Sequence, residues 1–71
     1  MSRFAFTLVD SEAEQFCWKI VQDMTGYGIS ESEALRRINE YWKGLTIGGK
    51  DEIVYHEEPS DWASVIFNGG R

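Results

Sequence analysis

The stretch that most restricts how this chain can fold is residues 30–43, a predicted helix whose beginning and end are both encoded locally. Ser30 is placed to cap the first turn, and Glu33 completes the reciprocal capping-box spacing. Gly44 follows the last residue of the pattern, where glycine enters the left-handed region at no steric cost. With about 100° of rotation per residue, the helix has one apolar face that requires burial, formed by Ala34, Leu35, Ile38, Tyr41 and Trp42.

A longer helix is predicted before it, over residues 10–25. Ser11 and Glu14 have the capping-box spacing, and a glycine-containing turn at residues 26–28 ends the helix. Because the connection to residues 30–43 is short, the two helices must lie against each other, either roughly antiparallel or at a steep angle. Apolar residues mark its buried face: Ala13, Phe16, Cys17, Ile20, Val21 and Met24.

Two segments lack a helical pattern. Residues 1–9 alternate loosely between apolar and small residues, which is typical of a short edge strand or of an N-terminal arm laid over the core. Residues 44–59 contain glycines and charges and read as an extended loop. Within that loop, residues 53–55 are β-branched and aromatic, so we expect a very short strand there, opposite residues 46–47.

A short third helix is predicted over residues 60–67, after Pro59 and with Ser60 as its cap. The chain of 71 residues allows one domain, residues 1–71. The expected fold is therefore mainly all-α, with three helices: a helical hairpin, an extended loop or very short β segment, and a short C-terminal helix. Trp42 and Trp62 are expected in the shared core.

Composition restricts the partners and the location of the chain. The net charge of −5 repels phosphate backbones and anionic membranes at long range. No stretch reaches the roughly 20 apolar residues of a membrane span, so no membrane association is expected. Cys17 is the single cysteine, and the apolar start at residues 4–9 is too short for a signal peptide. We therefore expect a cytoplasmic protein.

The residues that could bind a metal or act as a nucleophile do not have the sequence spacing that such sites require. His56, with Asp51, Glu57 or Asp61, is a weak candidate for a metal site, because zinc motifs supply a second histidine or cysteine at fixed spacing and none is present here. A residue in a turn is the simpler interpretation of His56. Cys17 lies within an apolar helix face, where a thiol is unreactive. The sequence thus predicts no catalytic residue, cofactor or bound metal.

The two long helices and their short turn also resemble a DNA-binding helix-turn-helix. Glu31 and Glu33 would stand at the amino end of the recognition helix, where they repel phosphates. The basic residues on its outer face include Arg36, which is expected to pair with Glu40 four residues later. A nucleic-acid-binding regulator is therefore the alternative hypothesis, and it is disfavoured by charge.

Aromatic residues give the leading functional hypothesis. Trp18 points away from the apolar face of its helix, Phe67 lies at the margin of the last helix, and Phe4 and Phe6 belong to the N-terminal segment. An exposed aromatic patch of these four residues is typical of a partner surface. Alternatively, the N-terminal arm folds over Trp18 and leaves nothing exposed. The expected function is a non-enzymatic helical module that contacts another protein or a second copy of itself.

Several short motifs, read together, resemble a family of small uncharacterised bacterial proteins, a domain of unknown function. The resemblance covers about residues 16–67 and supplies no catalytic residue or ligand. It implies a bacterial, cytoplasmic origin. The motif residues are Gly28, Ile29, Ser30, Glu33, Ala34, Ile38, Asn39, Trp42, Tyr55, His56, Glu57, Pro59, Trp62 and Ala63.

Overall fold

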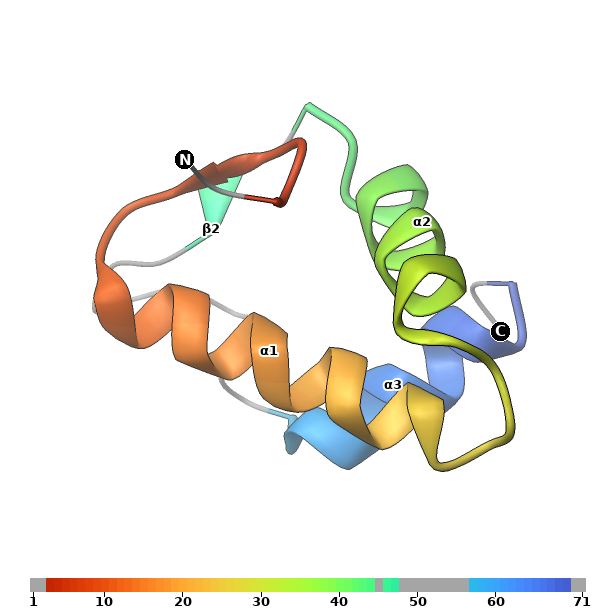
Figure 1. The fold of residues 1–71 in the computed structure, drawn as a ribbon. Coiled ribbons are helices and arrows are strands. Elements are labelled where there is room, and N and C mark those ends of the chain that lie inside the picture. Colours follow the sequence, from red (N-terminus) through yellow and green to blue (C-terminus); the bar gives the residue numbers. More distant parts are fainter. Residues whose placement is uncertain (1–2, 45, 48–56, 70–71) are drawn as a thin grey trace.

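The computed structural model of the chain describes residues 3–44, 46–47 and 57–69. The three-helix, mainly all-α prediction is confirmed for this part of the chain (Figure 1). The strand expected at residues 53–55 and the candidate metal ligand His56 lie outside the described residues. In chain order the elements are β1 (Thr7–Leu8), α1 (Ser11–Thr25), α2 (Glu31–Tyr41), β2 (Thr46–Ile47) and α3 (Pro59–Phe67).

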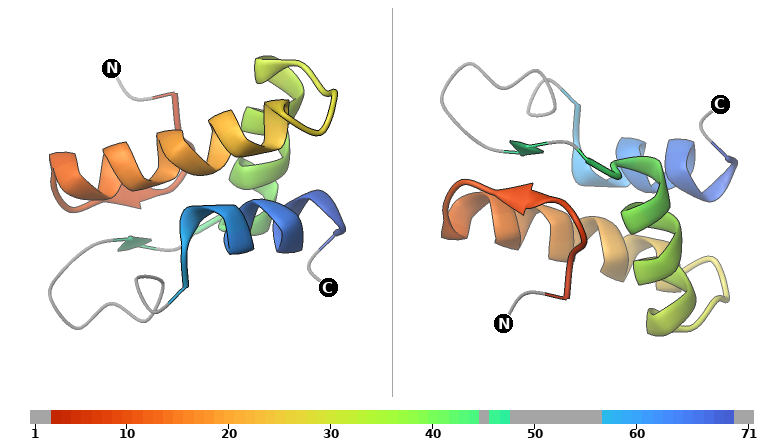
Figure 2. Two further views of the ribbon diagram at one scale, coloured as in Figure 1. Left: turned by 90° about the horizontal axis from the view of Figure 1, so that it is seen from below. Right: turned by 90° about the horizontal axis from the view of Figure 1, so that it is seen from above.

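The axes of the three helices lie along two directions. Helices α1 and α3 lie side by side and run the same way, while α2 crosses both steeply (Figures 1 and 2). The turn from α1 to α2 includes Gly28 with φ of 98°, a conformation that favours glycine over other residues. A short connection allows either an antiparallel pair or a steep crossing of α1 and α2, and the steep crossing is the one observed. None of the helices in the described part of the chain has the length and apolar character that crossing a membrane requires.

The start of α1 differs from the predicted capping box. Asp10, and not Ser11, is the N-cap residue, and the Ala13 amide donates to its Oδ1 at 2.9 Å. The extended backbone at Asp10, with φ of −150°, aims its side chain at the free amides of the first turn. Its carboxylate also adds a charge that the helix dipole favours.

The start of α3 also differs from the prediction: the helix begins one residue before the predicted range, and its N-cap is two residues before the predicted cap. Glu58 is the N-cap residue without a side-chain cap hydrogen bond, and Pro59 is the first helical residue. Proline suits this position because its φ is fixed near the helical value and its missing amide has no partner to lose. The predicted cap, Ser60, therefore lies inside the helix.

The beginning of α2 is confirmed, whereas its end comes earlier than predicted. The Glu33 amide donates to Ser30 Oγ at 3.1 Å, so Ser30 is the N-cap residue. The helix ends at Tyr41, and a turn leads to Gly44, which has the expected positive φ of 80°. The sequence predicts a helix up to Lys43 because the side chains of residues 42–43 continue the helical pattern beyond the last regular turn.

The two strands form a parallel pair. Thr7 is in register with Thr46, and Leu8 with Ile47. Residues 46–47 thus adopt the expected extended conformation, and their partner in the described structure is the N-terminal segment. Since a parallel pair requires a long crossover, α1 and α2 together supply the connection between the two strands.

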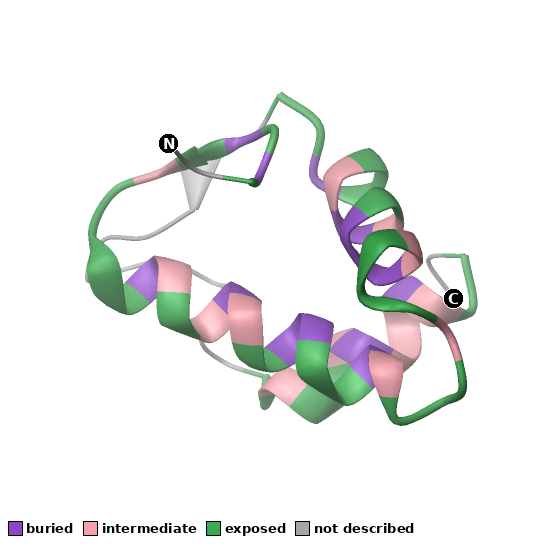
Figure 3. Ribbon diagram, viewed as in Figure 1, coloured by how far each residue is buried: buried purple, intermediate pink, exposed green. Residues whose placement is uncertain are grey.

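The core lies between the inward sides of the three helices and under the N-terminal segment (Figure 3). Trp42 is 4% exposed, and its ring lies 5.3 Å from that of half-buried Trp62. The predicted apolar face of α2 is buried except at Tyr41, which is 38% exposed at the last turn. Among the residues that the structure describes, the largest fully buried side chains come from α1 and α2: Cys17, Ile20, Val21, Met24 and Ile38.

Candidate functional site

The N-terminal segment is held on the helices in the manner of a bound peptide. We call residues 3–8 the arm. Phe4 is 6% exposed and packs edge-on against Trp18, with 5.1 Å between ring centroids. Phe6 is 5% exposed and packs edge-on against Trp42 at 5.6 Å. Two aromatic side chains, spaced two residues apart, therefore anchor the arm, which bends at Arg3, Ala5 and Phe6 and becomes a strand at Thr7.

Asn39 fixes the main chain of the arm. The Ala5 amide donates to Asn39 Oδ1 at 2.7 Å, and Asn39 Nδ2 donates to the Arg3 carbonyl at 3.2 Å. One carboxamide thus satisfies a donor and an acceptor on either side of Phe4, as a neighbouring β-strand would. We call Trp18, Asn39 and Trp42, together with β2, the arm-binding surface.

The first residue of the arm contributes a charge. The Arg3 guanidinium carbon lies 5.9 Å from the centroid of the Trp18 ring, and Nη1 lies 3.7 Å from a Glu31 carboxylate oxygen. Both side chains of this ion pair are about half exposed, so the contact contributes little to stability. It does favour a cation at this end of the arm-binding surface.

The four residues predicted as partner-surface candidates do not form an exposed patch. Phe4 and Phe6 are buried, and Trp18 is half-buried beneath Phe4, so the alternative in which the arm covers Trp18 is the observed one. Phe67 is half-buried too, with its ring 4.8 Å from that of Tyr27. The candidates are not exposed together because the arm reaches the margin of α1 and covers Trp18 there, which helical spacing alone would leave uncovered.

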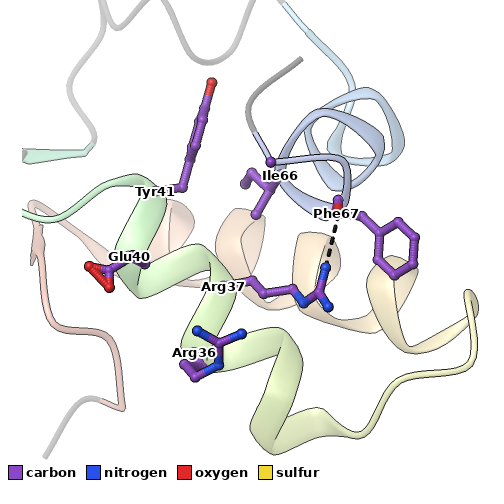
Figure 4. A pocket seen from close by; sticks show the side chains of 7 residues that line it. Arg36, Arg37, Glu40, Tyr41, Ile66 and Phe67 are labelled. Carbon is purple, nitrogen blue, oxygen red and sulfur yellow. Dashed lines mark hydrogen bonds between the residues drawn. The ribbon is translucent and has the colours of Figure 1, made fainter.

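A second candidate site is an open hollow of about 530 Å³ between α2 and the end of α3 (Figure 4). Arg36, Arg37 and Tyr41 line one side and Ile66 and Phe67 line the other. Arg37 Nη1 donates to the Phe67 carbonyl at 2.9 Å, and its guanidinium carbon lies 5.0 Å from the centroid of the Phe67 ring. Arg37 therefore holds α2 to the carboxyl end of α3, where the helix dipole favours a cation.

The charges beside this hollow belong to one network. Glu33 accepts hydrogen bonds from Arg36 at 2.6 and 3.0 Å and from Arg37 at 2.8 Å. The sequence predicts that Arg36 pairs with Glu40; its hydrogen-bonded partner is instead Glu33, which offers both carboxylate oxygens, and Glu40 contributes a smaller coulombic attraction. The two arginines thus engage the Glu33 carboxylate, which the capping-box prediction pairs with the Ser30 amide.

These contacts make Glu33 a source of acid sensitivity. Its hydrogen bonds to Arg36 and Arg37 lower the pKa of Glu33 from the ordinary 4.5 to about 2. A carboxyl with a lowered pKa in the folded state stabilises the fold above its ordinary value, and this contribution is lost as the pH falls toward the folded value. We expect Glu33→Gln to flatten the fall in urea midpoint between pH 4.5 and 2. An unchanged slope in this variant would contradict the assignment.

Cys17 is a core residue, as the sequence indicates. It is fully buried, and burial, with a smaller contribution from the nearby Glu14 charge, raises the pKa of its thiol to about 12. We expect a thiol reagent at pH 8 to label the folded chain at least about 100-fold more slowly than the chain in denaturant. Labelling of the folded chain at the denatured rate would show that the α1 face is open.

The described residues outside these two sites offer few chemical groupings. They contain no group of three or more histidine, cysteine or acidic side chains placed to hold a metal ion. Sequence reasoning missed Asn39 as the residue that binds the arm and Arg37 as the link to α3. Asn39 bonds the arm and Arg37 bonds Phe67, each across 30 or more residues of the chain, and no local sequence pattern indicates such distant contacts.

No protein-family model, curated protein or solved structure gives a significant match to this chain.

Proposed function

We propose that this chain is a non-enzymatic helical module that recognises a short polypeptide segment on its arm-binding surface. The observation that supports this proposal is the way the arm itself is held. Its main chain is bonded by Asn39 and paired with β2, and its alternate side chains, Phe4 and Phe6, are buried against tryptophans. Strand pairing for affinity and pockets for alternate side chains for specificity are the two means by which sheet edges bind peptides.

The surface defines the chemistry of its occupant. It fits a segment with a cation at the first position, aromatic side chains at the second and fourth, and an aliphatic side chain at the sixth. These are the positions of Arg3, Phe4, Phe6 and Leu8 in the arm. The proposal places this module in the bacterial cytoplasm, in keeping with the family resemblance and the single cysteine.

One observation favours a nucleic-acid partner instead: α2 crosses α1 steeply, as in a helix-turn-helix. The charges favour a protein partner. Glu31 stands in the first turn of α2, and Glu33 engages both Arg36 and Arg37. Binding to duplex DNA with a steep salt dependence would overturn the proposed function.

The test separates the arm from its surface. We expect the full chain carrying Phe4→Ala and Phe6→Ala to bind a fluorescent peptide with the sequence of residues 3–9. Each phenylalanine of the peptide that is replaced by alanine should weaken binding at least about 10-fold, so a peptide that lacks both rings should bind at least about 100-fold more weakly. The reason is that burying one phenylalanine is worth about 1.5–3 kcal/mol. Adding Asn39→Ala to the chain should weaken binding of the intact peptide in the same way.

The experiment remains decisive if the double variant is partly unfolded. In that case the peptide should restore the far-ultraviolet circular dichroism of the helices in proportion to its binding. Equal affinity for the peptides with and without their phenylalanines, or no binding and no recovery of helix, would contradict the proposed function.

A further inference from the structure

We propose that two copies of this chain exchange their arms, so that each arm occupies the arm-binding surface of the other copy. This inference rests on the proposed function, because it requires that surface to accept an arm from outside its own chain. It adds the identity of the occupant, which is a second copy of the same chain.

The first support is the position of the hinge. β1 ends at Leu8 and α1 begins at Ser11, so the chain reverses direction within Val9 and Asp10 (Figure 2). The arm runs back along α1 and is attached to the rest of the molecule through this reversal. Asp10 already has an extended backbone and caps α1, so a change of backbone at Val9 is what would carry the arm away from its own helices while the cap is kept. Exchange of an element through such a short connection needs no change in the helices themselves.

The second support is that every described arm contact can be made again by another copy. Phe4 would meet Trp18, Phe6 would meet Trp42, and Asn39 would bond the main chain of the incoming arm. An exchanged pair thus loses none of these contacts. It differs from the single chain in the hinge and in the entropy of bringing two chains together.

The third support is the exposed hinge residue, and it favours a second copy over an unrelated segment. Val9 is 54% exposed, more than any other large apolar residue in the described part of the chain. In a symmetric exchanged pair the two straightened hinges pass each other, so Val9 of each copy gains an apolar neighbour. A separate peptide would leave this side chain in water.

Exchange should depend on concentration, because the arm of a closed chain competes at an effective concentration on the order of millimolar. We expect wild-type chain, warmed near its unfolding midpoint at about 1 mM and cooled, to contain a species of twice the 8.2 kDa chain mass. Sedimentation velocity measures its share. Dilution and rewarming should return it to the single chain.

Two variants locate the contact. Val9→Asp places like charges at the hinge and should weaken association at least about 10-fold, while Gln15→Asp, which adds the same charge at an exposed position of α1, should not. Circular dichroism confirms folding of each. The inference is overturned if the wild type stays a single chain, if Val9→Asp associates like Gln15→Asp, or if association survives loss of both arm phenylalanines. Peptide binding without association would leave the proposed function standing.

Discussion

Replacing Trp42 by alanine should remove a large share of the free energy of unfolding at 25 °C. Removal of a buried tryptophan costs about 3–5 kcal/mol, and a chain of this length has roughly 4–11 kcal/mol of stability in all. Trp42 also connects parts of the molecule that are distant in sequence, because its ring packs against Phe6 of the arm and Trp62 of α3. Urea unfolding followed by circular dichroism measures the loss.

Tyr41→Ala is the matched control. Tyr41 precedes Trp42, is aromatic and lies 6.3 Å from Trp62 between ring centroids, yet it is 38% exposed. Its replacement should cost about 1 kcal/mol, the value of an edge contact between rings. Equal losses for the two variants would show that Trp42 is not the centre of the core.

Phe6→Ala should cost about 3 kcal/mol, at the lower end of the range for a buried phenylalanine. The lower end applies because the arm lies outside the helices, joined to α1 through Val9 and Asp10, and can detach without opening them. Urea unfolding should give a lower midpoint, with a reduced dependence on urea if the arm is already released in the folded variant.

Ala5→Ser is the matched control for Phe6→Ala. Ala5 lies between the two anchors, is exposed, and contributes its amide to Asn39, which serine retains. Its effect should stay within about 0.5 kcal/mol, as for other surface positions. A loss below about 1 kcal/mol for Phe6→Ala would mean that the arm is not seated on Trp42 in solution.

Local signals explain which parts of the fold were predictable. Ser30 and Gly44 mark α2 because capping and positive φ depend on the residues themselves and on their immediate neighbours. The apolar faces of α1 and α2 follow from helical periodicity alone. At the start of α1 two good caps stand next to each other, and the path of the entering chain selects Asp10 over Ser11.

Distant contacts explain what was not predictable. Asn39 reads as an ordinary polar residue on a helix surface until the arm is placed against it. Trp18 shows the same limit, because its position off the apolar face fits both an exposed patch and a covered one. Only the three-dimensional path of residues 3–8 decides between them, and it places Phe4 over Trp18.

The most direct test of the binding surface is to locate the peptide on it. An isotope-filtered nuclear Overhauser experiment on the Phe4→Ala, Phe6→Ala chain with the peptide of residues 3–9 reports which protons meet. Contacts from the first peptide phenylalanine to Trp18 and from the second to Trp42 are the predicted result. Contacts confined to another face, such as the hollow beside Arg36 and Phe67, would contradict the account.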